Sequence, residues 1–260
     1  MAAVELERRG PAAWLWLNRP DVRNALNGDI QDLLSRELQK IEADKSARVV
    51  VLAGRGQAFS AGGDLNRMEQ AAQMTKARNR KEAGKFAALL HRIYRFPKPV
   101  IARVHGAAFA GGMGLVAACD LVVAAEEAEF CLPEVRIGLV PAMISPYIAR
   151  ALGEPQTRRY MLTGERLTAP EAQRIGFVHE CVPMAELDAA VEKIAGHLAK
   201  GGPNALAQAK KLLAHIAAAP IGAKLAGHTA GLLAEVRAGA EAREGIRSFL
   251  EKRKPAWGSS

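Results

Sequence analysis

The chain has 260 residues, of which 49% are hydrophobic, proportions typical of a folded domain and not of a disordered or fibrous chain. Its formal net charge of +9 attracts anions, but only 5% of its residues are aromatic, a poor basis for stacking nucleic-acid bases. The N-terminus lacks the apolar segment of a secretory signal, and no apolar run reaches the roughly 18 residues of a membrane span. We therefore expect a cytoplasmic protein that binds neither membrane nor nucleic acid.

Three cysteines lie far apart in apolar surroundings, at Cys119, Cys131 and Cys181. Their odd number and wide spacing argue against a disulfide framework and against a CxxC metal site. We expect buried free thiols and no bound metal.

The first elements are a strand pair, a helix and a buried strand. Residues 4–6 and 14–17 are apolar segments separated by a Gly-Pro break, which is typical of a strand pair. Asn27 is a good helix N-cap, and apolar residues then recur at helical spacing from Ile30 to Ile41. The apolar run 49–53 is too short for a helix and predicts a buried strand.

Two glycine-rich turns each follow a buried strand. The first, residues 58–65, precedes a helix that Pro97 and Pro99 end, and the second, residues 106–114, follows the strand 100–104 and opens a short helix. Such turns present unpaired backbone N–H groups that can hold an anion or a developing oxyanion. The alternative is a tight packing turn that needs glycine only for backbone freedom. Neither turn matches a dinucleotide or phosphate-loop pattern.

The remaining chain alternates between predicted strands and helices and then becomes helical. Strands are predicted at 121–124, 129–131 and 177–182, with helices at 145–152, 154–163 and 169–175 between them. From residue 184 onward the pattern is almost entirely helical. We predict an α/β core over residues 1–195 and a C-terminal helical region over 196–260.

The order and spacing of short motifs then become specific. They read NRP at 18–20, NAL at 24–26, AFSAGGDL at 58–65, KPVIA at 98–102, HG at 105–106, AGG at 110–112, ACDL at 118–121, PE at 133–134, GL at 138–139 and FLEKR at 249–253. Over nearly the whole chain this set resembles the crotonase (enoyl-CoA hydratase/isomerase) superfamily. The resemblance implies a crotonase-like spiral of ββα units with two roughly perpendicular sheets, and C-terminal helices that mediate homotrimers or homohexamers.

The resemblance also implies roles for particular residues. The backbone N–H groups of Gly63 and Gly111 would form an oxyanion hole for a thioester carbonyl, with Ala61 and Asp64 among the substrate-binding residues of the first turn. Glu134 is in the position of the catalytic glutamate, where burial can poise a carboxyl group for proton transfer. Lys252, in the basic cluster 252–254, is a candidate for the 3′-phosphate of CoA; a solvated tail is the alternative.

Two departures from the family pattern concern the substrate. Two-acid hydratases carry a second glutamate where this chain has Gly114, and many relatives have a glycine-rich stretch where this chain has residues 141–147. Both departures resemble the branch that hydrates methylglutaconyl-CoA and isohexenylglutaconyl-CoA. We expect Gly114, being small and neutral, to admit a substrate with its own distal carboxylate.

The main functional expectation is hydration of a 2-enoyl-CoA to a 3-hydroxyacyl-CoA, with an acyl-CoA thioester as substrate and no separate cofactor. One alternative is an enoyl-CoA isomerase, because a single carboxylate at Glu134 is enough to move a proton between two carbons. The alternative of another class is RNA binding. The net charge of +9 suggests it, as does RNA binding known within the family that this chain resembles.

Overall fold

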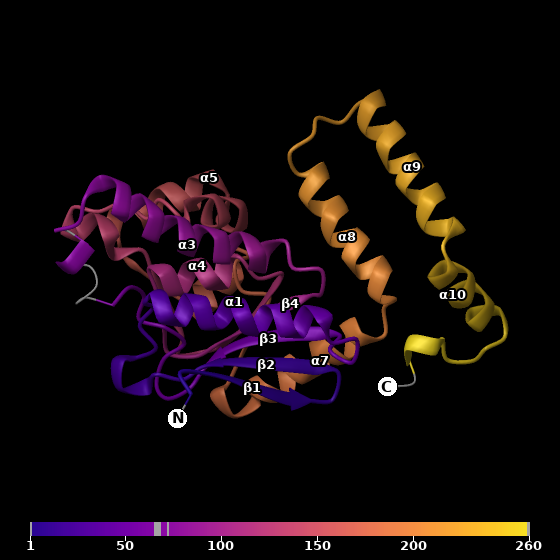
Figure 1. Cartoon of the computed structure of the whole chain (residues 1–260), viewed down its shortest axis with the longest axis horizontal. Coiled ribbons are helices and arrows are strands. Elements are labelled where there is room, and N and C mark those ends of the chain that lie inside the picture. Colours follow the sequence, from indigo (N-terminus) through magenta and orange to yellow (C-terminus); the bar gives the residue numbers. More distant parts are fainter. Residues whose placement is uncertain (1, 65–68, 72, 259–260) are drawn as a thin grey trace.

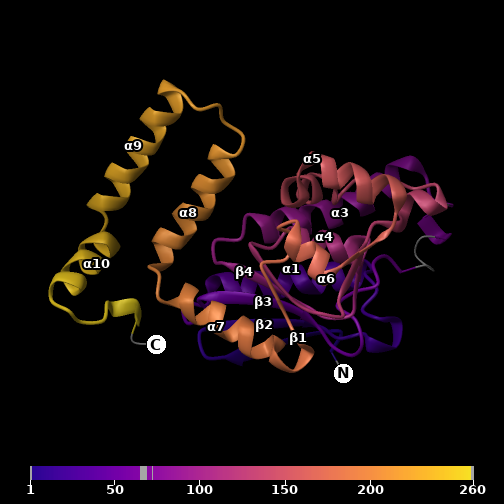
Figure 2. The same ribbon diagram turned by 180° about the vertical axis from the view of Figure 1, so that it is seen from behind.

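The structure, a computed structural model, describes residues 2–64, 69–71 and 73–258. Figure 1 shows a core of sheets and helices beside an arm made of the C-terminal helices, and Figure 2 shows the same two parts from behind. Within the described ranges, no helix combines the length and the apolar character needed to cross a membrane.

The main sheet has six strands in the order β1-β2-β3-β4-β6-β9. Strands β1 and β2 are antiparallel, and each later neighbour is parallel. Every residue of β2 and β3 is buried, as expected for strands covered on both faces. The predicted strand at 177–182 is shorter in the structure. The strands are β1 Val4–Arg9, β2 Ala12–Leu17, β3 Val49–Gly54, β4 Val100–Val104, β6 Leu121–Ala125 and β9 Glu180–Val182.

Helices cover both faces of this sheet. Helices α1 (Gly28–Ala43) and α3 (Lys76–Tyr94) pack on one face, where they bury alternate residues of β2 and β3. Helix α7 (Leu187–Ala199) packs on the other face against the remaining alternate residues. Asn27 caps α1, since its Oδ1 accepts a hydrogen bond from the Ile30 N–H at 3.0 Å, as the sequence predicted.

A second sheet has three short strands in the order β5-β7-β8. These are β5 (Ala107–Phe109), β7 (Glu129–Cys131) and β8 (Arg166–Thr168). The sequence predicts β7 but neither β5 nor β8. Three residues are too few to show a period, and β5 lies inside what the sequence presents as one glycine-rich turn.

Three helices pack around the second sheet: α4 (Gly111–Ala117), α5 (Ser145–Thr163) and α6 (Ala169–Arg174). The two helices predicted over 145–163 form one run with a kink at Gly153, whose φ of 72° and ψ of 164° are not helical. The kink separates the run almost where the sequence predicted the break.

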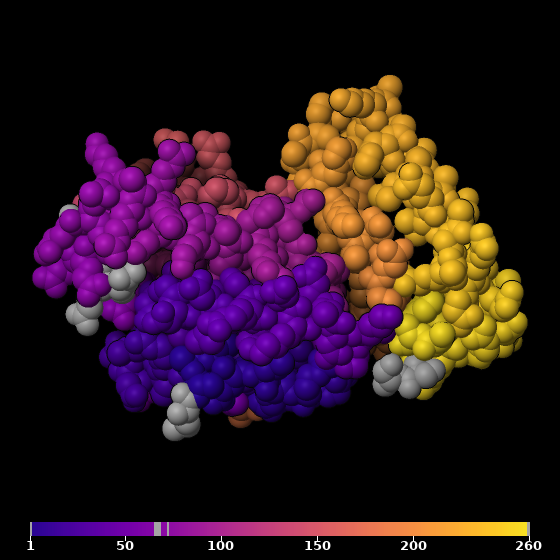
Figure 3. Space-filling view, in the orientation of Figure 1, coloured from indigo at the N-terminus to yellow at the C-terminus, as the bar shows by residue number. Residues whose placement is uncertain are grey.

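The arm consists of α8 (Pro203–Ile216), α9 (Ala223–Ala238) and α10 (Ala240–Leu250). In the space-filling view it stands beside the core (Figure 3). The expected boundary at residue 195 falls inside α7, so the chain leaves the main sheet only after Ala199. Arg48 holds the root of the arm by donating to the carbonyl oxygens of Gly201 at 2.6 Å and Trp257 at 3.0 Å.

Candidate active site

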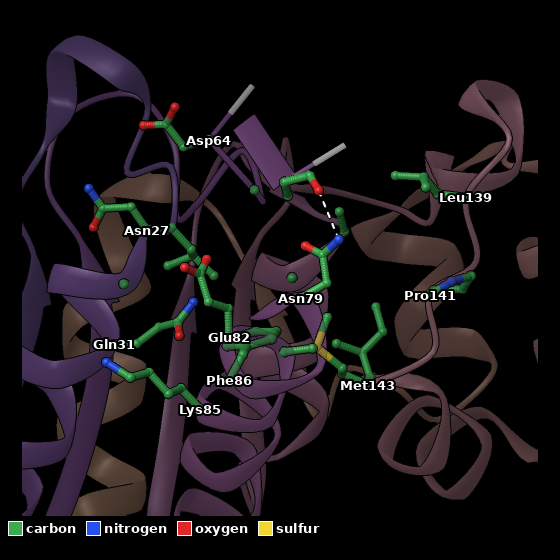
Figure 4. A pocket seen from close by; sticks show the side chains of 18 of the residues that line it. Asn27, Gln31, Asp64, Asn79, Glu82, Lys85, Phe86, Leu139, Pro141 and Met143 are labelled. Atoms are coloured by element: carbon green, nitrogen blue, oxygen red, sulfur yellow. Dashed lines mark hydrogen bonds between the residues drawn. The ribbon is translucent and has the colours of Figure 1, made fainter. Parts of the chain in front are cut away.

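A pocket of about 770 Å³ lies between α1, α3, the two glycine-rich turns and the segment 134–144. Of the residues predicted from the sequence, it brings together Gly63, Asp64, Gly111 and Glu134. Figure 4 shows polar side chains, among them Gln31 and Lys85, along one side and Leu139 and Pro141 along the other. The pocket therefore has a polar wall and an apolar wall.

The two glycine-rich turns interlock. Gly62 has a φ of +94°, and a Cβ atom there would lie 2.8 Å from the Cβ of Ala110. A Cβ atom on Gly112 would lie 2.6 Å from the carbonyl oxygen of Ser60. A backbone hydrogen bond joins the same segments, since the Phe109 N–H donates to the Ser60 carbonyl oxygen at 3.0 Å. The packing interpretation is therefore correct for Gly62 and Gly112, whose neighbours in sequence line the pocket.

The N–H groups of Gly63 and Gly111 form no hydrogen bond with any residue that the structure describes. Gly111 opens α4, and the residue before it, Ala110, has φ 48° and ψ −120°. That conformation costs a non-glycine residue on the order of 1–3 kcal/mol and persists only when the surroundings impose it. The Ala110 N–H donates to the Cys131 oxygen at 2.8 Å, which ties the strained residue to β7.

Asn24 supports the first turn through hydrogen bonds, a role that sequence reasoning missed. It is buried, has a φ of 55°, and donates from Nδ2 to the carbonyl oxygens of Arg55 at 2.9 Å and Ala58 at 2.8 Å. Its Oδ1 accepts from the Arg19 N–H at 2.8 Å, and its own carbonyl accepts from Ser60 Oγ at 2.9 Å. Asparagine suits this place because it tolerates positive φ and its amide both donates and accepts.

His105 has a structural role beside the first turn. Its ring lies between Arg103 Nη1, 2.8 Å from Nδ1, and the Gly56 carbonyl oxygen, 2.8 Å from Nε2. Burial, aided by the Arg103 charge, lowers the pKa of His105 below its ordinary value. A neutral ring that accepts from Arg103 and donates to Gly56 fits these contacts and steadies the first turn.

Glu134 lies in a short 3₁₀ helix, Pro133–Ile137, directly after β7. Its Oε2 atom is buried and has no hydrogen-bond partner among the described residues. Burial raises the pKa of the Glu134 carboxyl above its ordinary value of 4.5. A carboxyl group with a raised pKa can both accept and donate a proton, and Glu134 lines the pocket while one of its oxygens has an unused hydrogen-bonding capacity.

Asp64, which lines the pocket, has its Oδ2 atom 3.7 Å from Arg19 Nη1. The other predicted residues, Ala61, Gly114 and Lys252, are not among the lining residues. Ala61 is not part of the lining and donates its N–H to the Arg23 oxygen. Gly114 lies behind Ile144, which lines the pocket in its place. Lys252 is exposed, follows α10 and does not line the pocket.

Several lining residues were not predicted as site residues. Arg78, Lys81 and Lys85 follow one another at helical spacing on α3 and face the pocket. Phe86 and Ile144 belong to its apolar part. The three-and-four spacing of the basic residues was a signal in the sequence, but nothing there shows which surface that face of α3 meets.

The chain is similar to known proteins over nearly its whole length. The sequence profile described as enoyl-CoA hydratase/isomerase matches residues 9–260. This chain belongs to that family, within the crotonase superfamily. It is 40% identical over 253 residues to a candidate enoyl-CoA hydratase of Thermus thermophilus, covering 97% of this chain and 99% of the other.

Two further relatives of the enzyme are similar over nearly their whole length. The 2,3-dehydroadipyl-CoA hydratase of Escherichia coli is 35% identical, with 98% of each chain covered. The crystal structure of an enoyl-CoA hydratase from Shewanella pealeana is 36% identical and superimposes with a TM-score of 0.95, covering 98% of this chain and 96% of the other. The crotonase fold predicted from the motifs is confirmed.

The first prediction concerns the support of the first turn. Replacing Asn24→Ala leaves several buried backbone groups without partners, so the free energy of unfolding should fall by about 3 kcal/mol. Urea unfolding measures this, with exposed Asn204→Ala as the matched control, expected within about 0.5 kcal/mol of wild type. Equal behaviour of the two variants would show that Asn24 does not hold the turn.

The second prediction concerns the pH dependence of stability. Because the pKa of Glu134 is raised in the folded enzyme, its proton stabilises the fold, fully below the ordinary pKa of 4.5 and less as pH rises through the raised value. Glu134→Gln should therefore be more stable than wild type at neutral pH, and the difference should disappear as the pH falls below 4.5. Thermal unfolding across pH measures it, with the exposed Glu154→Gln as control; a difference independent of pH contradicts the assignment.

Proposed function

We propose that this enzyme adds water across the double bond of a 2-enoyl-CoA and yields a 3-hydroxyacyl-CoA. The observation that carries the proposal is the buried, unpartnered Oε2 of Glu134 in the same pocket as Gly63 and Gly111, whose N–H groups lack partners among the described residues. Two donors and one proton-transfer group are the parts that addition to an enoyl thioester needs. The names of the relatives support the same reaction.

In the proposed mechanism, the thioester oxygen accepts hydrogen bonds from the Gly63 and Gly111 N–H groups. As the water oxygen bonds to C3, electron density moves through C2 to the thioester oxygen, and the two donors stabilise this enolate-like state. Glu134 takes a proton from the water and returns one to C2, so the balance is one water added and the enzyme unchanged. Loss of one preorganised donor typically costs on the order of 10²–10³ in rate.

Isomerisation of a 3-enoyl-CoA is the second candidate function. The position of Ile144 supports it. Ile144 occupies the place beside Gly114 that a second acidic side chain would need, so Glu134 would act without that partner. One carboxylate is enough to move a proton between C2 and C4 of an enoyl chain. Hydration of a 2-enoyl-CoA consumes the conjugated chromophore, whereas isomerisation of a 3-enoyl-CoA creates it.

We propose that the acyl group is branched or carries a distal carboxylate, as in 3-methylglutaconyl-CoA. The apolar wall suits a branch. Arg78, Lys81 and Lys85 form a basic face of α3 that also contains Glu82. Arg78 pairs with Glu82 at 3.9 Å and Lys85 pairs with Asp32 at 3.1 Å, so Lys81 is the residue of this face that suits a carboxylate at the other end. The Escherichia coli relative supports this, since the adipyl group in its name has a second carboxyl group. The basic face replaces the earlier expectation that Gly114 makes room for the carboxylate, because Ile144 fills that room.

We further propose that the enzyme assembles as a cytoplasmic homotrimer or homohexamer through its arm. Apolar side chains on α10 are exposed in the single chain, Phe249 by 82% and Leu250 by 74%. Exposed apolar surface of this kind is commonly covered by another subunit. Lys252 follows α10 directly, so its proposed contact with a CoA phosphate would be made across such an interface.

The third prediction tests the chemistry. Glu134→Gln should bind CoA esters nearly as wild type does and should lower the turnover of crotonyl-CoA by about 10² or more, the scale of a lost general acid/base. The loss of the 2-enoyl chromophore measures turnover, and a saturated acyl-CoA measures binding. Near-normal turnover would remove Glu134 from the mechanism.

The fourth prediction tests the acyl group. Wild type should have a higher kcat/KM for 3-methylglutaconyl-CoA than for crotonyl-CoA, and Lys81→Gln should lower only the former, on the order of three- to fivefold, as expected for an exposed charge. Exposed Lys45→Gln, remote from the pocket, is the matched control. Equal losses for both esters would assign Lys81 to the CoA phosphates, and a wild-type preference for crotonyl-CoA would contradict the carboxylated substrate.

A further inference from the structure

Gly114 and Ile144 are thirty positions apart in the sequence and share one space. A Cβ atom built on Gly114 would lie 2.1 Å from Cγ2 of Ile144 and 2.7 Å from its Cβ. Real Cβ atoms essentially never approach other atoms so closely, so even alanine does not fit beside Ile144. The Cα atom of Ile144, at 3.8 Å, is the nearest atom at ordinary contact distance.

Ile144 has little freedom to withdraw. Its side chain is 2% exposed, and its carbonyl oxygen accepts hydrogen bonds from the N–H groups of Tyr147 and Ile148, both at 3.0 Å. A β-branched side chain also has few alternative rotamers. The backbone and the side chain are therefore both fixed where α5 begins.

Gly114 is equally fixed, and it is coupled to the second turn. Its N–H donates to the carbonyl oxygen of Ala110 at 3.1 Å, and Ala110 is the strained residue that precedes Gly111. The flanking residues Met113 and Leu115 are fully buried. Any atom added at position 114 must therefore displace Ile144 or move the helix that begins with Gly111.

We propose that Gly114 and Ile144 form one coupled determinant of acyl-group specificity. The missing side chain at position 114 lets Ile144 pack onto α4, and Ile144 then presents hydrocarbon to the pocket that Glu134 also lines. Placing a carboxylate against this wall would bury it without a partner, so a charged acyl end has to point elsewhere. The wall limits the bulk of the acyl group on this side of the pocket.

The proposal explains two departures from the family pattern together, because the space left by the small residue at position 114 is filled by the side chain of Ile144. The family pattern that the chain resembles has a glutamate at position 114 and a glycine-rich stretch at 141–147, whereas this chain has glycine at 114 and the bulky Ile144 in that stretch. It rests on the proposed function only in taking an acyl-CoA as the ligand. Its tests therefore use stability and the binding of saturated esters, neither of which requires turnover.

The coupling is tested with a cycle of variants followed by thermal unfolding. Gly114→Ala should lower the Tm by about 5 °C or more, and Ile144→Gly should lower it through the cavity that it leaves. The double variant should lose clearly less than the sum of the two, because the new Cβ then enters the emptied space. Gly196→Ala, an open position in α7, is the control and should leave the Tm unchanged or raised.

Additive losses in the double variant, or a Gly114→Ala enzyme as stable as Gly196→Ala, would overturn the coupling. Either result would mean that residues 114 and 144 do not compete for the same space.

The specificity is tested by the binding of butyryl-CoA and hexanoyl-CoA. Ile144→Ala should bind hexanoyl-CoA more tightly relative to butyryl-CoA, by about threefold or more, because the wall recedes. Ile148→Ala is the matched control, since Ile148 is buried beside the site without lining the pocket, and its ratio should not change. An unchanged ratio in Ile144→Ala overturns the specificity role. Absence of hydration with a shifted binding ratio would instead overturn the proposed reaction and leave the wall in place.

Discussion

The site depends on the close approach of two turns that come from different parts of the chain. Gly62 contacts Ala110, and Gly112 contacts Ser60, at distances that leave no room for a Cβ atom at either glycine. Because these two glycines are used for packing, the next residue in the first turn and the previous one in the second line the pocket. The constraint acts on shape and not on side-chain chemistry, which is why glycine recurs at both turns.

Hydrogen bonds and packing in the rest of the fold hold the two turns together. The first turn follows β3 of the main sheet and is bound to Asn24 and His105, while the second is bound through β5 to β7, the strand that precedes the 3₁₀ helix with Glu134. The strained Ala110 and the unpartnered Glu134 oxygen both cost stability. Such costs concentrate where function requires them and are offset by the two buried clusters on the faces of the main sheet.

Local pattern was sufficient to predict much of this architecture. The Asn27 cap, the buried strands and the break near Gly153 are signals within a few residues, and the motif series identified the family. Contacts between distant segments were not predictable in the same way. The sequence shows glycine at position 114 but not Ile144 against it, and it shows three basic residues on α3 but not the pocket that they face. The roles of Ala61 and Lys252 remain predictions, since neither lines the pocket of the single chain.

The central claim is that the Gly63 and Gly111 N–H groups polarise the thioester carbonyl of a bound acyl-CoA. Difference infrared spectroscopy of butyryl-CoA, labelled with ¹³C at the thioester carbonyl, measures this polarisation directly. The account predicts a carbonyl stretch at lower frequency in the complex than in water. It also predicts a smaller shift in Gly111→Ala, whose new Cβ would lie 3.2 Å from Leu26 Cδ1 and 3.3 Å from Phe86 Cζ, so that either these side chains or the turn with its donor must move. A bound ester whose carbonyl frequency equals that in water would contradict it.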